Sequence, residues 1–82
     1  MKTYTFFNDP GHGWLEVPRS ELPPGFTPSE YSYQRGDLVY LEEDCDAPPF
    51  IIHHKLKPIQ LEEHHTDDEC FVRSLERFTC YS

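Results

Sequence analysis

Basic side chains are scarce in this sequence, which has 7 lysine and arginine residues against 15 aspartate and glutamate residues. The formal net charge at pH 7 is −8. Phosphate backbones are bound by clustered lysines and arginines, so we expect no direct binding of nucleic acid. The acidic excess favours a partner protein with a basic surface. A simpler interpretation is that the negative charge keeps a small protein in solution.

Long apolar runs are also missing. No run approaches the ~18 residues of a membrane-spanning helix, and the N-terminus lacks the apolar core of a secretory signal. We therefore expect a soluble, cytosolic protein. The cysteines are few and odd in number, namely Cys45, Cys70 and Cys80, and their spacing matches no disulfide framework. In a cytosolic protein they are expected to be reduced thiols.

The length of 82 residues corresponds to one domain, so residues 1–82 are expected to form a single small acidic domain. A chain this short buries roughly 60% of its unfolded surface, which leaves a thin core. Aromatic residues make up 15% of the chain, and they contribute the most buried area per residue to a small core. This favours a folded domain in spite of the 8 prolines.

Residues 31–46 organise the rest of the chain. They contain an aromatic start, a turn signal at residues 34–37, a strand signal at residues 38–42 and a dense acidic end. Leu38 and Tyr40 lie opposite Val39 and Leu41 on that strand, so both of its faces are apolar. Such a pattern is typical of a central strand covered on both sides.

Three further strands are predicted. Residues 2–7 and 14–17 alternate around the turn signal of residues 8–13, which predicts a hairpin over residues 2–17. Residues 59–63 alternate apolar and charged side chains, as is typical of an edge strand. The expected fold is α+β, with an antiparallel sheet of about four strands and one or two short helices.

Residues 48–57 are ambiguous between a helix and a strand. Ile52 and Leu56 are four residues apart, as on one helix face, but side chains from Phe50 to Leu56 also alternate with a period of two. We favour a helix, because Asp44 or Asp46 can cap its N-terminus. Residues 66–69 form a capping-box pattern. The apolar residues that follow it, Phe71, Leu75 and Phe78, have helical spacing, so a second short helix is predicted there.

Nothing in the sequence points to catalysis, and we assign no catalytic residue and expect no cofactor. Cys45 lies between Asp44 and Asp46, whose charges raise the pKa of a thiol and so keep it unreactive. The glycines form no phosphate-binding motif.

Metal binding is an alternative. The adjacent pairs His53-His54 and His64-His65, together with the cysteines, are residue types that zinc prefers. However, no Cys-x2-Cys or His-x3-His spacing occurs, and adjacent histidines point apart on a helix or strand. The run Glu42-Glu43-Asp44 offers oxygen ligands to a divalent cation, although it matches no EF-hand loop. We assign no metal ligand from the sequence and keep a small zinc domain as an alternative.

Protein binding is the leading interpretation. Nine acids and two lysines lie between residues 42 and 69. A rigid surface of spaced carboxylates can mimic nucleic acid and occupy the basic groove of a nucleic-acid-binding protein. Exposed Trp and Tyr side chains would add anchors, although packing in the core is the commoner role of such residues. The candidate partner-binding residues are Glu42, Glu43, Asp44, Asp46, Tyr31, Trp14, Glu62 and Glu63.

Three motifs carry a resemblance to a known group of proteins: DPGHGWLEVP at residues 9–18, YSYQRG at residues 31–36 and YLEEDCD at residues 40–46. On these motifs the chain resembles small uncharacterised proteins encoded by bacteriophages and prophages. It departs from the group at Pro48-Pro49, where the group has helix-forming residues. The resemblance implies a phage accessory protein that binds a host protein, such as a component of antiviral defence, in the cytoplasm of the host bacterium. A virion-associated structural role is a further alternative.

Overall fold

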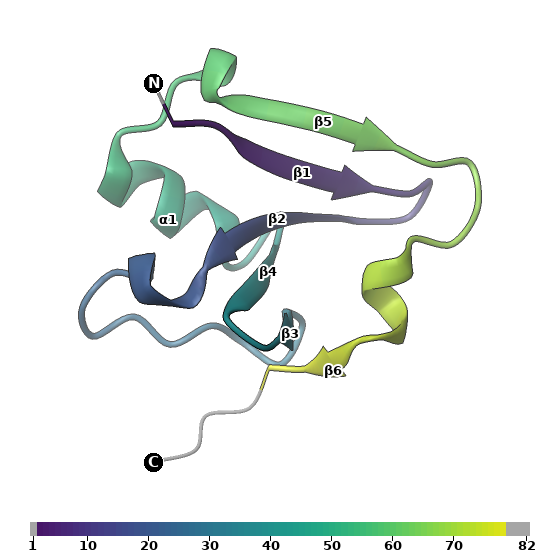
Figure 1. Ribbon diagram of the computed structural model, residues 1–82, viewed down its shortest axis with the longest axis horizontal. Coiled ribbons are helices and arrows are strands. Elements are labelled where there is room, and N and C mark those ends of the chain that lie inside the picture. Colours follow the sequence, from purple (N-terminus) through teal and green to yellow (C-terminus); the bar gives the residue numbers. More distant parts are fainter. Residues whose placement is uncertain (1, 79–82) are drawn as a thin grey trace.

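The protein forms one six-stranded mixed sheet in the spatial order β5-β1-β2-β4-β3-β6 (Figure 1). The structure, a computed structural model, describes residues 2–78; the terminal residues 79–82, which include Cys80, lie outside the description. The strands are β1 (Tyr4–Asn8), β2 (Gly13–Pro18), β3 (Tyr33–Arg35), β4 (Leu38–Glu42), β5 (Leu61–His65) and β6 (Glu76–Arg77). The predicted α+β class is confirmed.

The prediction of about four antiparallel strands is wrong, because β5 pairs parallel to β1. Parallel neighbours need a crossover connection. Here the chain leaves β4, passes through helix α1 (Ala47–His54), and returns to begin β5 beside the start of β1 (Figure 1). The other neighbouring strands pair antiparallel.

The predicted hairpin and central strand are confirmed. β1 and β2 pair with Phe6 opposite Leu15, and β2 continues into an antiparallel ladder with β4. Both faces of β4 are buried, since Val39 and Tyr40 are fully enclosed on opposite sides. The two central strands therefore hold the core together.

Helix α1 covers one face of the sheet, so the helical interpretation of residues 48–57 is confirmed as far as His54, and residues 55–57 lie beyond the helix. Its Phe50 is fully buried and packs edge-on against Tyr4, with ring centroids 5.5 Å apart. The helix ends at Lys55, which adopts a left-handed φ of 53°. Asp46 occupies the N-cap position, but its carboxylate makes no capping bond to the helix.

The opposite face is covered by the C-terminal segment. Trp14, Tyr33 and Tyr40 pack there with Cys70 and Val72. Within residues 2–78 there are also three short 3-10 turns: η1 (Arg19–Glu21), η2 (Pro58–Gln60) and η3 (Phe71–Ser74).

The predicted helix after residues 66–69 is wrong. The segment forms only the turn η3 and then strand β6, which pairs with β3. The buried residues are Cys70 and Val72, two apart, whereas Phe71 is 40% exposed. The helical spacing of Phe71, Leu75 and Phe78 is thus overridden by contacts with distant parts of the sheet.

Strand β5 lies at one edge of the sheet, as expected, but begins at Leu61 because residues 58–60 form η2. Its register places Glu62 opposite Thr5 and Glu63 opposite Phe6. Consecutive strand residues point to opposite faces, so these two glutamates do not share a face. Within residues 2–78, no helix has the length and apolar character needed to cross a membrane.

Candidate binding cleft at the acidic end of the sheet

The strand order brings the acidic segments of the sequence to one end of the molecule. Asn8, at the end of β1, pairs with both Gly13 and His65, and Trp14 pairs with Glu42. The ends of β1, β4 and β5 and the start of β2 therefore coincide. We call this the acidic end and define it by its solvent-accessible acids: Glu43, Asp44, Glu63, Asp67, Asp68 and Glu69.

Most of the basic residues lie away from the acidic end. Lys2 precedes β1, Arg19 follows β2, and Lys55 and Lys57 follow α1. Arg35 lies at the turn between β3 and β4, whose strands put Leu38 opposite Pro18. Five of the seven lysines and arginines thus lie at the opposite end, together with the acids Glu21 and Asp37.

The turn between β1 and β2 is built around Asp9. Its carboxylate accepts hydrogen bonds from the backbone N–H groups of Gly11 and His12, at 2.9 and 3.0 Å. It also accepts from Cys70 N at 3.0 Å and from the Arg73 guanidinium. The hydrogen bonds from Arg73 hold the pKa of the Asp9 carboxyl well below its usual range.

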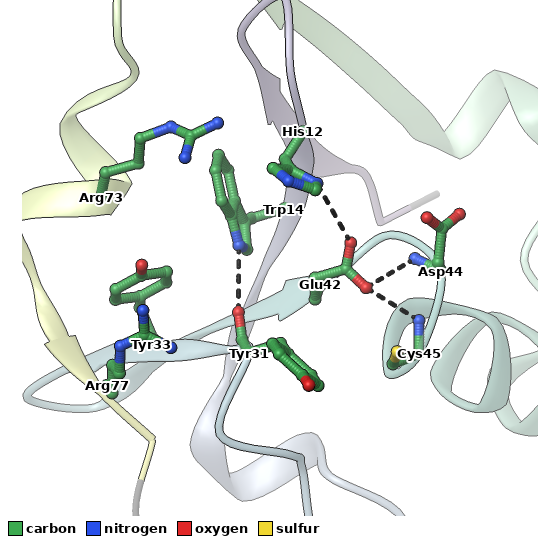
Figure 2. Close-up of a pocket in the computed structure, with 9 residues that line it drawn as sticks. All are labelled: His12, Trp14, Tyr31, Tyr33, Glu42, Asp44, Cys45, Arg73 and Arg77. Carbon is green, nitrogen blue, oxygen red and sulfur yellow. Dashed lines mark hydrogen bonds and ion pairs between the residues drawn. The ribbon is translucent and has the colours of Figure 1, made fainter.

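A cleft of about 300 Å³ opens beside this turn (Figure 2). Its base is aromatic: Trp14 and Tyr33 pack edge to face with centroids 5.9 Å apart. The guanidinium of Arg73 lies 5.2 Å from the Trp14 ring centroid, and that of Arg77 lies 5.6 Å from the Tyr33 ring centroid. The cleft is lined by His12, Trp14, Tyr31, Tyr33, Glu42, Asp44, Cys45, Arg73 and Arg77.

Glu42 is a buried acid that lines the cleft. Its Oε1 accepts hydrogen bonds from the backbone N–H groups of Asp44 and Cys45, both at 3.0 Å. Its Oε2 points toward His12 Nδ1 at 3.9 Å (Figure 2). The next residue, Glu43, has a raised pKa because of burial and then the charges of Asp44 and Glu42.

Cys45 lies at the edge of the cleft. The pKa of its thiol is raised, mainly by burial and secondly by a hydrogen bond to Glu42. A thiol with a raised pKa stays protonated and is a poor nucleophile. Cys45 and Cys70 are both free thiols.

The predicted partner-binding residues fall into two groups. Asp44, Glu62, Glu63 and Tyr31 are exposed, and Glu43 is half-buried. Trp14, Glu42 and Asp46 are buried instead. The Asp46 carboxylate accepts hydrogen bonds from Ser29 N at 2.9 Å, from Ser29 Oγ and from Ser32 Oγ, so it fixes the loop before β3.

The predicted histidine pairs do not converge on a common point. His54 Nε2 lies 2.7 Å from Glu21 O, and His65 is hydrogen-bonded to Asn8 Oδ1. Among residues 2–78, the one group of three side chains with metal-ligating atoms close together is His12, Glu42 and Glu43.

Sequence reasoning missed His12, Asp9 and Arg73 as site residues. Residues 8–13 were recognisable as a turn, but nothing local in the sequence connects them with Arg73, 64 residues beyond Asp9. The helix predicted after residues 66–69 gave no reason to place Arg73 beside Asp9.

Comparisons with models of protein families, with curated proteins and with solved structures give no match for this chain.

Proposed function

We propose that this chain is a non-enzymatic domain that binds a partner protein with a basic surface, and that the acidic end is the docking surface. The observation that carries the proposal is the gathering of acids at one end of the sheet. Six accessible acids lie there, whereas Lys2, Arg19, Arg35, Lys55 and Lys57 lie at the other end, mixed with Glu21 and Asp37.

The cation nearest the acidic end, Arg73, is paired with a carboxylate that is not one of the six accessible acids. Its Nε lies 2.6 Å from Asp9 Oδ2, whereas Arg77 lines the cleft beside Tyr33 and keeps its positive charge. A surface of one charge sign steers an oppositely charged partner and raises the association rate. The partner is therefore expected to present clustered lysines or arginines, as nucleic-acid-binding proteins do.

Tyr31 supplies an anchor at the rim of this surface. Its side chain is 57% exposed and lines the same cleft as Asp44 (Figure 2). A tyrosine beside a carboxylate can receive a basic side chain through a cation–π contact and an ion pair. This replaces Trp14, which is buried, as the aromatic contact residue.

The chemistry of Cys45 supports the proposal of a non-enzymatic role. A nucleophile needs a nearby base or a lowered pKa. Cys45 has a raised pKa and neighbours a carboxylate that stabilises its protonated form.

The resemblance to phage and prophage proteins suggests where the partner is found. We infer an accessory protein that acts in the cytoplasm of the host bacterium. The partner is then a host protein with a basic surface, such as a defence component or a nucleic-acid-binding protein that the acidic end inhibits by mimicking nucleic acid.

Capture of host proteins by paired charge variants tests the proposal. Glu63→Gln/Asp67→Asn neutralises two accessible acids of the acidic end, and Asp37→Asn/Glu76→Gln neutralises two exposed acids outside it. The wild-type chain and the control variant are expected to capture the same basic protein, and the acidic-end variant is expected to lose it. Equal capture by both variants would contradict the proposal.

A further inference from the structure

We propose that His12, Glu42 and Glu43 form a binding site for a divalent transition-metal ion, with zinc as the representative ion. Each side chain offers one ligand atom, and the three atoms lie within 4.8 Å of one another. His12 comes from the turn between β1 and β2, whereas the two glutamates come from the end of β4. The site therefore joins two loops that the sheet pairing brings side by side.

The three ligand atoms would have to move only slightly closer together to bind an ion. Zinc binds nitrogen and carboxylate oxygen at 2.0–2.2 Å, so neighbouring ligand atoms of a tetrahedral site are about 3.3 Å apart. His12 Nδ1 and Glu42 Oε2 are 3.9 Å apart. The His12 side chain is 53% exposed, so a side-chain rotation can bring its ring nitrogen closer.

Glu42 is oriented for this role by its own hydrogen bonds. Backbone N–H groups occupy Oε1, which fixes the carboxylate and leaves Oε2 facing His12 (Figure 2). Oε2 is left free of these backbone donors, although the side chain is only 8% exposed. A carboxylate that the backbone holds through one oxygen, and that faces an imidazole with the other, is an arrangement that an ion would complete.

Gly13 keeps the Glu43 ligand within reach. Glu43 N donates to Gly13 O at 3.0 Å, which ties the two loops together. A Cβ atom on Gly13 would lie 3.2 Å from Glu43 Oε2 and 2.3 Å from Phe6 Cε1. The absence of a side chain there lets the carboxylate lie against the β2 backbone.

The charge of the site also favours a dication. Two carboxylates and a neutral imidazole carry a charge of −2, and no lysine or arginine of residues 2–78 forms an ion pair with either glutamate. A divalent ion would neutralise that charge. One nitrogen and two oxygen ligands suit zinc, cobalt and manganese, whereas magnesium and calcium prefer oxygen alone.

Zinc titration of untagged, chelator-treated protein by calorimetry tests the site, with His12→Ala and Glu43→Gln as site variants. The controls are His53→Ala and Glu62→Gln, which remove an exposed histidine and an exposed carboxylate elsewhere. The wild-type chain is expected to bind one equivalent. Each site variant should weaken binding at least about tenfold, and each control should keep it within about twofold.

Cobalt substitution gives an independent readout, because the visible absorption of cobalt reports its ligands. The wild-type spectrum should change in His12→Ala and not in His53→Ala. His12 lies on an exposed turn, and far-UV circular dichroism verifies that the variant is folded. Wild-type zinc affinity in both site variants, or equal losses in the controls, would overturn the proposal. The titration uses no partner protein, so its outcome is independent of the docking proposal.

Discussion

Asp9 and Arg73 form a two-pronged ion pair, with Nε 2.6 Å from Oδ2 and Nη2 3.0 Å from Oδ1, across 64 residues of sequence. The pair joins the turn between β1 and β2 to the segment that carries η3. It places Arg73 against Trp14, on the wall of the cleft. The pair therefore fixes the side of the candidate binding cleft that Arg73 lines.

Asp9→Asn should destabilise the fold severely. The Asp9 side chain is 2% exposed, and removing its charge leaves the guanidinium without its partner. Loss of one member of a buried pair costs about 3–5 kcal/mol of unfolding free energy, a large part of the stability of so small a domain. Urea unfolding measures the change. Asp67→Asn, at an exposed site, is the control and should stay within about 0.5 kcal/mol of wild type.

The lowered pKa of Asp9 predicts that the unfolding free energy falls in acid. Hydrogen bonds from Arg73 lower the pKa of folded Asp9, so below about pH 3.9 the unfolded chain binds more protons than the folded chain. The contribution of Asp9 is present above that pH and is lost as the pH falls. Unfolding free energy measured across this range should decline more steeply for the wild-type chain than for Asp9→Asn. Parallel pH profiles would show that Asp9 is not the group responsible.

Tyr4 and Tyr40 are expected to make the stability of the fold depend on pH above about pH 10. Burial, assisted by hydrogen bonds to Glu21 and Glu16, raises the pKa of Tyr4 and Tyr40 to about 12. Their protonated forms stabilise the folded state below about pH 10, and that stability is lost as the pH rises from about 10 toward 12. Ultraviolet absorbance titration should show phenol ionisation delayed in the folded chain. The delayed fraction should shrink in Tyr40→Phe; an unchanged curve would contradict the assignment.

Tyr31 and Trp14 should respond in opposite ways to truncation. Tyr31→Ala should leave unfolding free energy nearly unchanged, because the side chain is largely exposed, and should weaken partner binding by more than about 1 kcal/mol. Trp14→Ala should destabilise the fold by about 3–5 kcal/mol, because the indole is buried in the core. Thermal unfolding and partner affinity, measured on the same preparations, separate the two roles. A destabilised Tyr31→Ala would show that the tyrosine is structural.

Local signals in the sequence predicted the elements that depend on local chemistry. The alternation around residues 8–13 was sufficient for the β1–β2 hairpin, and the apolar run of residues 38–41 was sufficient for β4. Helix α1 was also found, although Asp46, expected as one of two candidate caps, bonds Ser29 and Ser32 instead. Its carboxylate serves a loop distant in sequence, which no local pattern could indicate.

The elements that were missed depend on distant partners. A capping-box pattern at residues 66–69 favoured a helix, but Cys70 N and Arg73 are both held by Asp9, and Glu76 pairs with Gln34 in the sheet. These contacts outweigh a helical preference worth only a few tenths of a kcal/mol per residue. For the same reason the composition predicted an acidic surface but not which acids compose it. Glu42 and Asp46 are buried, and Asp67 and Asp68 were not among the candidates.

The most direct test of the docking surface is the association rate with the captured partner, measured for both charge variants as a function of ionic strength. Exposed charges are screened by salt, so an electrostatically steered association should slow markedly from low to physiological ionic strength. The account predicts that Glu63→Gln/Asp67→Asn associates more slowly and with a weaker salt dependence than wild type, and that Asp37→Asn/Glu76→Gln matches wild type. Identical rates and salt dependence for the two variants would contradict the acidic end as the docking surface.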